Sequence, residues 1–126
     1  MDIILPLSVL EDILPLSNFS GDRLIILYRE TDWSLSSYLS RVYELKTIRA
    51  SGELKKDVSR LRKLIRETGK NCEYLVILGR DPYLNMISIY SVMAECKKAV
   101  LTWNGIEGIE LSSKGKKAKM VRNLKK

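Results

Sequence analysis

Several short, continuously apolar segments constrain this chain more than any other feature of its sequence. Three of them cover residues 3–5, 24–28 and 74–78, and a fourth segment, residues 99–103, is interrupted only by Thr102. Such runs are typical of strands that are buried on both faces of a parallel sheet. The segments between them carry apolar residues in three- and four-residue steps, which indicate helices. This alternation predicts an α/β chain whose sheet is covered on both sides.

The connection between the first two strands predicts a short helix followed by a turn. Pro6 closes the first strand, and Ser8 is a candidate N-cap for a helix over residues 9–14. Glu11 lies three residues after Ser8 and completes a capping box. We expect Pro15 to end this helix, because proline cannot continue the hydrogen-bond pattern.

Two helices are predicted between the second and third strands. Thr31 or Asp32 caps the first, whose apolar face consists of Leu35, Leu39, Val42 and Leu45. Ser51 and Gly52 interrupt the pattern. The second helix carries an apolar face made of Leu54, Val58, Leu61 and Ile65.

A third helix is predicted from Pro82 to about Glu95. Asp81 is its N-cap, and Pro82 takes the first helical position, which favours proline. This segment is apolar nearly all round, so we expect it to be largely buried, in the core or at a subunit interface. A hairpin at Asn104-Gly105 then returns the chain as a strand over residues 106–111. The predicted fold is a Rossmann-like three-layer sandwich, with a mostly parallel sheet and a C-terminal antiparallel hairpin edge.

Charge divides the chain near residue 111. The 126 residues include 22 Lys and Arg, 15 Asp and Glu and no His, for a net charge of +7. All the acids lie at or before Glu110, so we expect a neutral Rossmann-like domain over residues 1–111 and a basic tail over 112–126. Such a tail is either a solvated segment or linker, or an arm that binds nucleic acid. Its candidate contacts are Lys114, Lys116, Lys117, Lys119 and Arg122.

The composition excludes several kinds of chemistry. Without histidine, the chain cannot form a Ser-His-Asp or Cys-His nucleophile pair, a histidine base or a histidine-ligated metal. Two cysteines cannot build a four-thiolate zinc site. The favoured function below involves no cofactor and no metal. Cys72 and Cys96 are expected to be reduced core residues of a cytoplasmic protein. No signal-peptide pattern and no apolar run long enough to span a membrane is found, so no membrane partner is expected.

Candidate binding residues follow the strands, because open parallel sheets bind ligands beyond the carboxyl ends of their strands. The turn at Gly79 leads into a helix N-terminus, where backbone N–H groups favour an anion, and Arg80 adds a guanidinium. The carboxylate of Asp81 competes for the same N–H groups. The turn therefore indicates either an anion site or a simple helix cap.

The other strand ends offer further candidates, each with a structural alternative. After the second strand, Arg29 and Glu30 precede Asp32, where an acid can hold a ribose hydroxyl or simply cap a helix. Glu30, Asp32 and Asp81 together form a candidate set for a divalent metal. Trp103 ends a strand beside a turn, where an indole can stack on a base or cover the end of the sheet.

The helix predicted over residues 53–68 has a basic face. Its candidate contacts to nucleic acid are Lys55, Lys56, Arg60 and Lys63. In the alternative interpretation the face is solvated, because Glu53, Asp57 and Glu67 can pair with these cations along the helix.

The order of elements resembles a known family. Residues 73–111 resemble the second half of a CARF domain, the CRISPR-associated Rossmann fold, in which a strand, a glycine-containing turn, an apolar helix, a further strand and a hairpin follow one another. The N-terminal half is also similar, with a strand, a polar turn at Ser8, a helix and a strand that ends in Arg29, Glu30 and Thr31. The resemblance covers about residues 2–111.

The resemblance implies a homodimer that binds a cyclic oligoadenylate across its two-fold axis, in CRISPR-linked antiviral signalling. Carried over by position, the turns that face the ligand are Leu7, Ser8, Val9 and Gly79, Arg80, Asp81, with Asn85 one turn further on. Arg29, Thr31 and Trp103 complete the predicted ligand-binding set. Some family members cleave their ligand with the RNA's own 2′-hydroxyl, a ring-nuclease chemistry that needs no histidine.

Three hypotheses therefore stand. The first is a CARF-like module that binds a cyclic oligoadenylate or a related nucleotide, with no catalytic residue assigned. The second is an accessory protein that binds nucleic acid through the basic tail and the basic helix face. The third is a metal-dependent nuclease that uses Glu30, Asp32 and Asp81.

Overall fold

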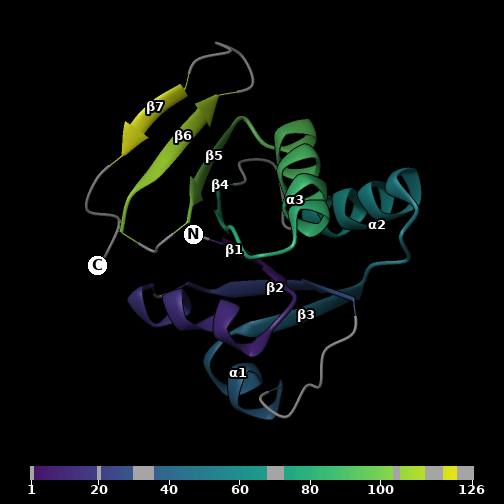
Figure 1. Cartoon of the computed structure of the whole chain (residues 1–126), viewed down its shortest axis with the longest axis vertical. Helices are drawn as coiled ribbons and strands as arrows, with labels where there is room; N and C mark the ends of the chain where they lie inside the picture. The colour runs from purple at the N-terminus through teal and green to yellow at the C-terminus, as the bar shows by residue number, and fades with distance from the viewer. Residues whose placement is uncertain are drawn as a thin grey trace.

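A single seven-stranded sheet organises the molecule (Figure 1). The computed structural model describes residues 2–19, 21–29, 36–67, 73–103, 106–112 and 118–121. Its strands are β1 (Asp2–Leu7), β2 (Arg23–Tyr28), β3 (Glu44–Arg49), β4 (Glu73–Ile77), β5 (Lys98–Thr102), β6 (Gly108–Ser112) and β7 (Ala118–Val121). Their spatial order is β3-β2-β1-β4-β5-β6-β7. The first five in this order are parallel, and β6 and β7 are antiparallel to their neighbours.

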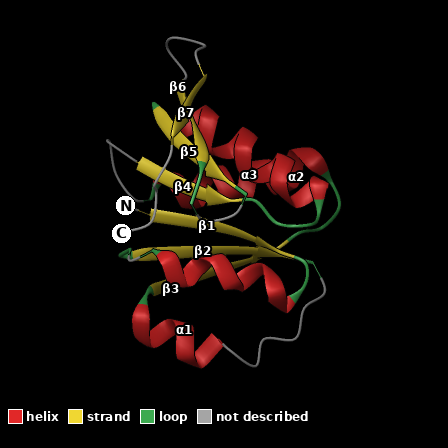
Figure 2. Ribbon diagram, turned by 60° about the vertical axis from the view of Figure 1, so that its left-hand side comes forward, coloured by secondary structure: helices red, strands yellow, loops and turns green. Residues whose placement is uncertain are grey.

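Helices cover both faces of this sheet. They are the 3-10 helix η1 (Leu10–Asn18) and the α-helices α1 (Ser36–Val42), α2 (Leu54–Arg66) and α3 (Pro82–Glu95). Figure 2 shows α2 and α3 against one face and α1 against the other. The predicted α/β, Rossmann-like three-layer arrangement with an antiparallel C-terminal edge is therefore confirmed.

The central strands are buried on both faces because their side chains alternate between two cores. In β1, Ile4 packs with α2 and α3, whereas Ile3 and Leu5 pack with η1 and α1. All three side chains are almost fully buried. A strand with this environment needs apolar residues at every position, which explains the continuous apolar runs of the sequence.

The first connection differs from its prediction. Pro6 does not close β1 but lies within it and pairs with Leu27 of β2. The pairing of β1 with β4 ends at Ile4, so Pro6 lies where β1 has a partner on one side only. A missing N–H group is tolerated at such a position. The helix that follows is a 3-10 helix that continues through Pro15 to Asn18, so the expectation that Pro15 ends it is wrong.

The strand β3 is the main element that the sequence pattern did not indicate. Its start was assigned to a helix ending at Leu45, but α1 ends at Val42 and the chain then pairs with β2 along all six residues of β3. Only Ile48 of β3 is buried, because β3 is an edge strand. Edge strands carry charged side chains and lack the apolar run of a central strand. Thr31, Asp32 and Leu35 lie outside the described residues.

The C-terminal end of the sheet also extends further than expected. Residues Ala118–Val121, assigned to the basic tail, form β7 and pair with β6. Lys119 lies within β7. The other candidate contacts of the tail, Lys114, Lys116, Lys117 and Arg122, lie outside the described residues.

One further expectation is confirmed and another is corrected. The helix α3 is largely buried as expected, with Leu84 and Ile87 in the core, although Tyr90 is 54% exposed. Cys96 is disulfide-bonded rather than a reduced thiol, which removes the argument from reduced cysteines for a cytoplasmic protein. Its only possible partner within the chain, Cys72, lies outside the described residues. Among the helices of the described residues, none is long and apolar enough to cross a membrane.

Candidate functional site

The strand order reverses between β1 and β4, and this reversal places the candidate site. The chain leaves β1 toward β2 on one side, and leaves β4 toward β5 on the other. In open α/β sheets the crevice at the carboxyl ends of two such strands is the usual ligand site. Two turns flank this crevice here: residues 8–9, which follow β1, and residues 79–81, which follow β4.

A cavity of about 880 Å³ opens at this end of the sheet. We call it the arginine cavity, and it is lined by Ser8, Arg29, Arg49, Ala50, Ser51, Gly52, Arg60 and Asp81. Arg29 and Arg49 stand at the ends of β2 and β3, and Arg60 projects from α2. Three cations and one carboxylate line the cavity, so its potential favours an anion.

The three arginines are tied to one another through the backbone. The Nε of Arg49 donates to the carbonyl oxygen of Arg29 at 3.1 Å. An Nη of Arg60 donates to the carbonyl oxygen of Arg49 at 2.9 Å. A guanidinium has five N–H donors, so these contacts between described residues engage only part of each group.

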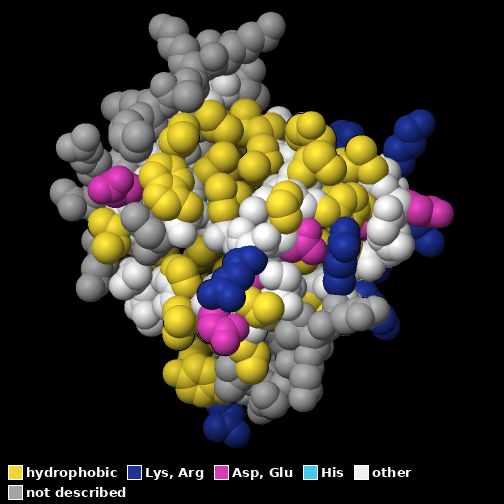
Figure 3. Space-filling model, viewed as in Figure 1, with side chains coloured by type: hydrophobic (Ala, Val, Ile, Leu, Met, Phe, Trp, Pro, Cys, Tyr) yellow, Lys and Arg dark blue, Asp and Glu magenta, His cyan; other side chains and the backbone are white. Residues whose placement is uncertain are grey.

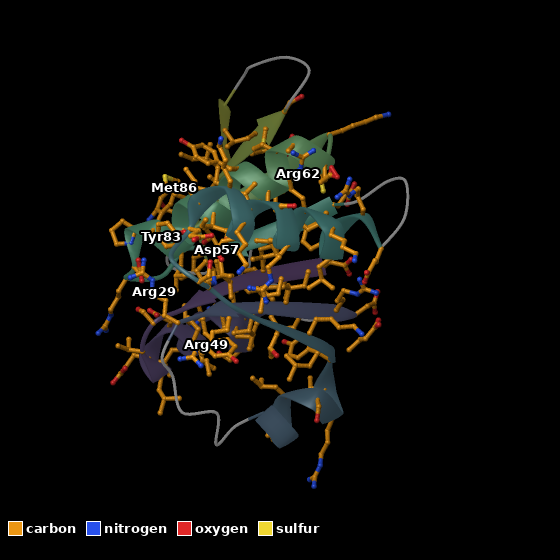
Figure 4. The ribbon with its side chains drawn as sticks, turned by 90° about the vertical axis from the view of Figure 1, so that its right-hand side faces the viewer. Arg29, Arg49, Asp57, Arg62, Tyr83 and Met86 are labelled. Atoms are coloured by element: carbon orange, nitrogen blue, oxygen red, sulfur yellow. The ribbon has the colours of Figure 1, made fainter. Side chains whose placement is uncertain are left out.

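Arg29 is further positioned by two residues at the start of α3. Its Nε lies 3.5 Å from an oxygen of Asp81. Its guanidinium lies over the ring of Tyr83, 4.6 Å from the ring centroid. Figure 4 shows Arg29 and Tyr83 close together, at the same end of the sheet as Arg49. A cation held over an aromatic face in this way is attracted by the negative face of the ring.

One wall of the arginine cavity is fixed by the buried side chain of Asp57. This carboxylate has no exposed surface. It accepts hydrogen bonds from the Ser51 backbone N–H (2.8 Å) and hydroxyl (2.7 Å), the Gly52 N–H (3.1 Å) and the Tyr83 hydroxyl (2.7 Å). Gly52 has a φ of +92°, a conformation that glycine adopts without the strain of a Cβ. Asp57 therefore joins the loop before α2 to the first turn of α3.

The same network sets the charge of its members. Burial alone would raise the pKa of Asp57, but the hydrogen bonds from Ser51, Tyr83 and Gly52 outweigh it, so the pKa lies below its ordinary value. Burial raises the pKa of Tyr83 to about 12, together with its hydrogen bond to the Asp57 carboxylate. Asp57 is thus a buried anion and Tyr83 a neutral donor. The expectation that Asp57 pairs with lysines on an exposed helix face is wrong.

The turn after β1 is held by a carboxylate, but not by the predicted one. Asp12 accepts hydrogen bonds from the Ser8 N–H (2.9 Å), the Ser8 hydroxyl (3.0 Å) and the Val9 N–H (3.2 Å). Val9, rather than Ser8, is the N-cap of η1. The predicted capping box between Ser8 and Glu11 is therefore wrong by one position.

The turn after β4 is fastened by an asparagine. The Asn85 side chain accepts from the Gly79 N–H and donates to the Gly79 carbonyl, both at 2.9 Å. A Cβ at Gly79 would lie 2.6 Å from the carbonyl oxygen of Pro6, so only glycine fits against β1 here. Asn85 therefore positions this turn, and its predicted contact with a ligand stays a prediction.

Asp81 caps α3 as predicted. Its Oδ1 accepts from the Tyr83 N–H at 2.9 Å and the Leu84 N–H at 3.4 Å. Pro82 holds the first helical position. Of the two alternatives for this turn, the helix cap is confirmed, and the carboxylate itself occupies the N–H groups that would attract an anion.

A second cavity, of about 410 Å³, is lined by residues of the turn after β4 and of η1. We call it the tryptophan cavity, and it is lined by Glu11, Asp12, Pro15, Leu78, Gly79, Arg80, Asn85 and Trp103. Trp103 is 45% exposed. The ends of β4 and β5 lead into this cavity. They are joined by a hydrogen bond of 2.7 Å from the Leu78 N–H to the Thr102 carbonyl.

The structure divides the predicted ligand-binding residues between the two cavities. Ser8, Arg29 and Asp81 line the arginine cavity, whereas Gly79, Arg80, Asn85 and Trp103 line the tryptophan cavity. Leu7 is fully buried in the core, and Val9 lines neither cavity. Thr31 lies outside the described residues.

Arg49, Ser51 and Gly52 were not predicted from the sequence. Arg49 is the last residue of β3 and Arg29 directly follows β2, so an arginine at a strand end was the available signal, but β3 itself was not recognised. Ser51 and Gly52 were interpreted only as a helix break. Their role depends on the tertiary contact with Asp57.

The carboxylates proposed for a metal cannot be assembled from the described residues. Among these residues, no group of three His, Cys, Asp or Glu side chains could hold a metal ion. Glu30 and Asp32 lie outside the described part of the chain. Asp81 is engaged with the N–H groups of α3 and with Arg29. The nuclease hypothesis stays a prediction.

The basic face of α2 is exposed as predicted. Lys55, Lys56, Arg60 and Lys63 are all exposed. Figure 3 shows basic side chains gathered over α2, whereas hydrophobic side chains gather nearer to α3. Arg60 also lines a shallower cavity of about 330 Å³, together with Lys46, Thr47, Ile48, Lys63, Leu64 and Glu67.

The fold and the site together define a Rossmann-like α/β protein with an arginine-lined cavity at the switch point of its sheet. Comparisons of the chain with protein-family models, with curated proteins and with solved structures found no match. The CARF resemblance therefore stays a prediction.

Proposed function

We propose that this chain binds a nucleotide through its phosphate groups, which lie in the arginine cavity. The observation that carries the proposal is that Arg29, Arg49 and Arg60, from three different elements, line one cavity at the carboxyl end of the sheet. Guanidinium groups form paired hydrogen bonds with phosphate oxygens. The position is the one at which open α/β sheets bind ligands.

The acidic residue of the cavity is compatible with this ligand. One carboxylate oxygen of Asp81 accepts the hydrogen bonds that cap α3, and the other pairs with Arg29. A phosphate beside Arg29 therefore replaces one contact of that guanidinium, while Arg49 and Arg60 have no carboxylate partner among the described residues. The cavity keeps a positive excess that attracts a polyanion.

Among nucleotides, we propose that the ligand is a cyclic oligoadenylate. A homodimer of this chain would bind it in CRISPR-linked antiviral signalling. The support for this choice is the CARF-like order of elements, together with the position of Ser8 and Asp81 in the lining of the arginine cavity. The chain acts as a binding module in this proposal. Incubation with the same ligand also tests for ring-nuclease cleavage.

The experiment is calorimetric titration with cyclic oligoadenylate, ATP and inorganic triphosphate, using wild type and Arg49→Ala. We expect Arg49→Ala to weaken binding about tenfold or more, because a hydrogen bond to a charged group is lost. Arg41→Ala, which removes an exposed arginine from α1, is the matched control and should bind as wild type does. Equal affinities of wild type and Arg49→Ala for all three ligands would contradict the proposal. Incubation of the complex followed by chromatography of the ligand reports cleavage.

A second candidate function is the binding of single-stranded nucleic acid along α2. The observation that favours it is that Arg60 lines both the arginine cavity and the shallower cavity beside Lys46 and Lys63. Cations on successive turns of a helix are roughly 5 Å apart and can meet different phosphates. Lys63→Ala should then reduce the salt dependence of oligonucleotide binding, while ATP affinity is unchanged.

A further inference from the structure

We propose that the tryptophan cavity is a separate subsite that holds the base of the nucleotide whose phosphates lie in the arginine cavity. This inference rests on the proposed function and deepens it, because it requires a ligand with an aromatic base rather than a bare polyphosphate.

The two cavities share the same pair of turns. Ser8 lines the arginine cavity, and Asp12, which accepts two hydrogen bonds from Ser8, lines the tryptophan cavity. In the other turn, Asp81 lines the first cavity and Gly79 the second. Because Gly79 and Asp81 are two positions apart in the chain, their Cα atoms are at most about 7 Å apart, so the two cavities approach each other at this turn. In the proposal, the ligand crosses the turn with one sugar between its base and its phosphates.

The residues that line the two cavities differ, and the difference indicates which cavity holds the base of the ligand and which holds its phosphates. None of the described residues that line the arginine cavity is aromatic, and Arg29 covers the nearby ring of Tyr83. The tryptophan cavity offers the half-exposed indole of Trp103, with Pro15 and Leu78 as further apolar surface. Bases stack on aromatic side chains whatever their sequence.

Charge supports the same assignment. The tryptophan cavity contains Glu11 and Asp12 beside a single cation, Arg80. The negative charges disfavour a phosphate there, whereas a neutral base is unaffected. The guanidinium of Arg80 is exposed and can stack on the free face of a base. Phosphates therefore belong with the three arginines, and the base belongs with Trp103.

The walls of the tryptophan cavity are preorganised. Asn85 fixes Gly79 with two hydrogen bonds, and the Leu78 N–H fixes the end of β4 to the Thr102 carbonyl. The Thr102 hydroxyl donates to the Glu107 carbonyl at 2.7 Å, which ties the residue before Trp103 to the residue before β6. An aromatic surface that is already held in place loses little conformational entropy on binding.

The test compares a ligand that has a base with one that lacks it. ATP, cyclic oligoadenylate and inorganic triphosphate are titrated into wild type and Trp103→Ala. We expect Trp103→Ala to weaken ATP and cyclic oligoadenylate about five- to 100-fold, the range for loss of one base–aromatic stack, and to leave triphosphate unchanged. Trp103→Phe retains an aromatic face and should keep most of the affinity. Tyr90→Ala removes an aromatic residue that is exposed outside both cavities and is the matched control.

A spectroscopic readout accompanies the affinities. The chain has two tryptophans, so a Trp33→Phe background reports Trp103 alone. Nucleotide should quench its fluorescence, and triphosphate should not. If triphosphate binds in a manner that depends on Arg49, but Trp103→Ala leaves nucleotide affinity unchanged, the base subsite is overturned and the proposed function stands. If none of the three ligands binds wild type, both fail.

Discussion

Asp57 shows how a single residue can support a binding site without touching a ligand. Its carboxylate is fully buried and accepts four hydrogen bonds, from the loop before α2 and from α3. A buried anion with this many donors is stabilised relative to its protonated form. Its position behind Ser51 and Gly52 makes the shape of the arginine cavity depend on its charge.

This charge predicts how stability depends on pH. Because the pKa of Asp57 is lower in the folded chain than its ordinary value of 3.8, its contribution to stability is present above pH 3.8 and is lost as the pH falls through the folded pKa. Asp57→Asn should lower the free energy of unfolding at pH 7 by about 2–3 kcal/mol and should weaken this acid dependence. Urea titrations from pH 7 to pH 3 measure both effects. Asp2, whose pKa burial raises, is present in both proteins and cancels in the comparison.

Gly79 predicts a second effect at a single residue. A Cβ at this position would approach the Pro6 carbonyl oxygen to 2.6 Å. This oxygen belongs to the backbone of β1, so it cannot move away as the end of a flexible side chain could. Gly79→Ala should therefore destabilise the chain by about 1–3 kcal/mol. Gly52→Ala is an informative comparison, because no atom lies within 4 Å of its Cβ position and its cost comes from the positive φ alone. Thermal unfolding of both variants distinguishes the two causes, and an unchanged melting temperature for Gly79→Ala would contradict the steric argument.

At the scale of elements, α2 has two different faces with different roles. Leu61 and Ile65 are fully buried against the sheet, whereas Arg62 and Arg66 pair with Glu95 of α3 at 3.6 and 3.1 Å. The helix is thus held by its apolar face and by a partly exposed ion pair that contributes less. Its outer lysines remain available to solvent.

The apolar face of α2 predicts a contrast between two leucines. Leu61→Ala should lower the free energy of unfolding by about 2–5 kcal/mol, because it leaves a cavity in the core. Leu54→Ala, the same substitution at a residue 42% exposed in the first turn of the helix, should cost far less. Chemical denaturation of the two variants checks the difference. Equal losses would mean that α2 is not packed against the sheet as described.

Elements also show which parts of the fold can be predicted from sequence. The strands β1, β2, β4 and β5 were predicted because burial on both faces requires continuous apolar residues. The edge strand β3 was not, since one buried residue in six gives no periodic signal. Asp57 lies three residues after Leu54 and four before Leu61, so helical spacing alone places it toward the buried face. Its four donors are tertiary contacts that no local pattern contains.

At the scale of the whole molecule, ligand binding and folding are coupled through the arginine cavity. The cavity is built from segments that follow β1, β2, β3 and β4, which come together only in the folded sheet. A ligand that binds the folded chain alone shifts the unfolding equilibrium by mass action.

This coupling predicts a thermal shift. A ligand at 100 times its dissociation constant should stabilise wild type by about 2.7 kcal/mol and raise its melting temperature accordingly. The shift should be reduced in Arg49→Ala and retained in Arg41→Ala. Differential scanning fluorimetry with ATP and with cyclic oligoadenylate provides the measurement. A shift of equal size in wild type and Arg49→Ala would place the ligand elsewhere on the molecule.

The two carboxylate oxygens of Asp81 have different partners, which affects how the binding site can evolve. Oδ1 holds the first turn of α3, whereas Oδ2 meets Arg29. A ligand that pairs with Arg29 in place of Asp81 leaves the hydrogen bonds at the start of α3 intact. Ligand binding and the stability of α3 therefore depend on different oxygens of the same carboxylate. Substitutions at position 29 can therefore change ligand specificity during evolution without destabilising α3. Substitutions at position 81 change both ligand specificity and the stability of α3.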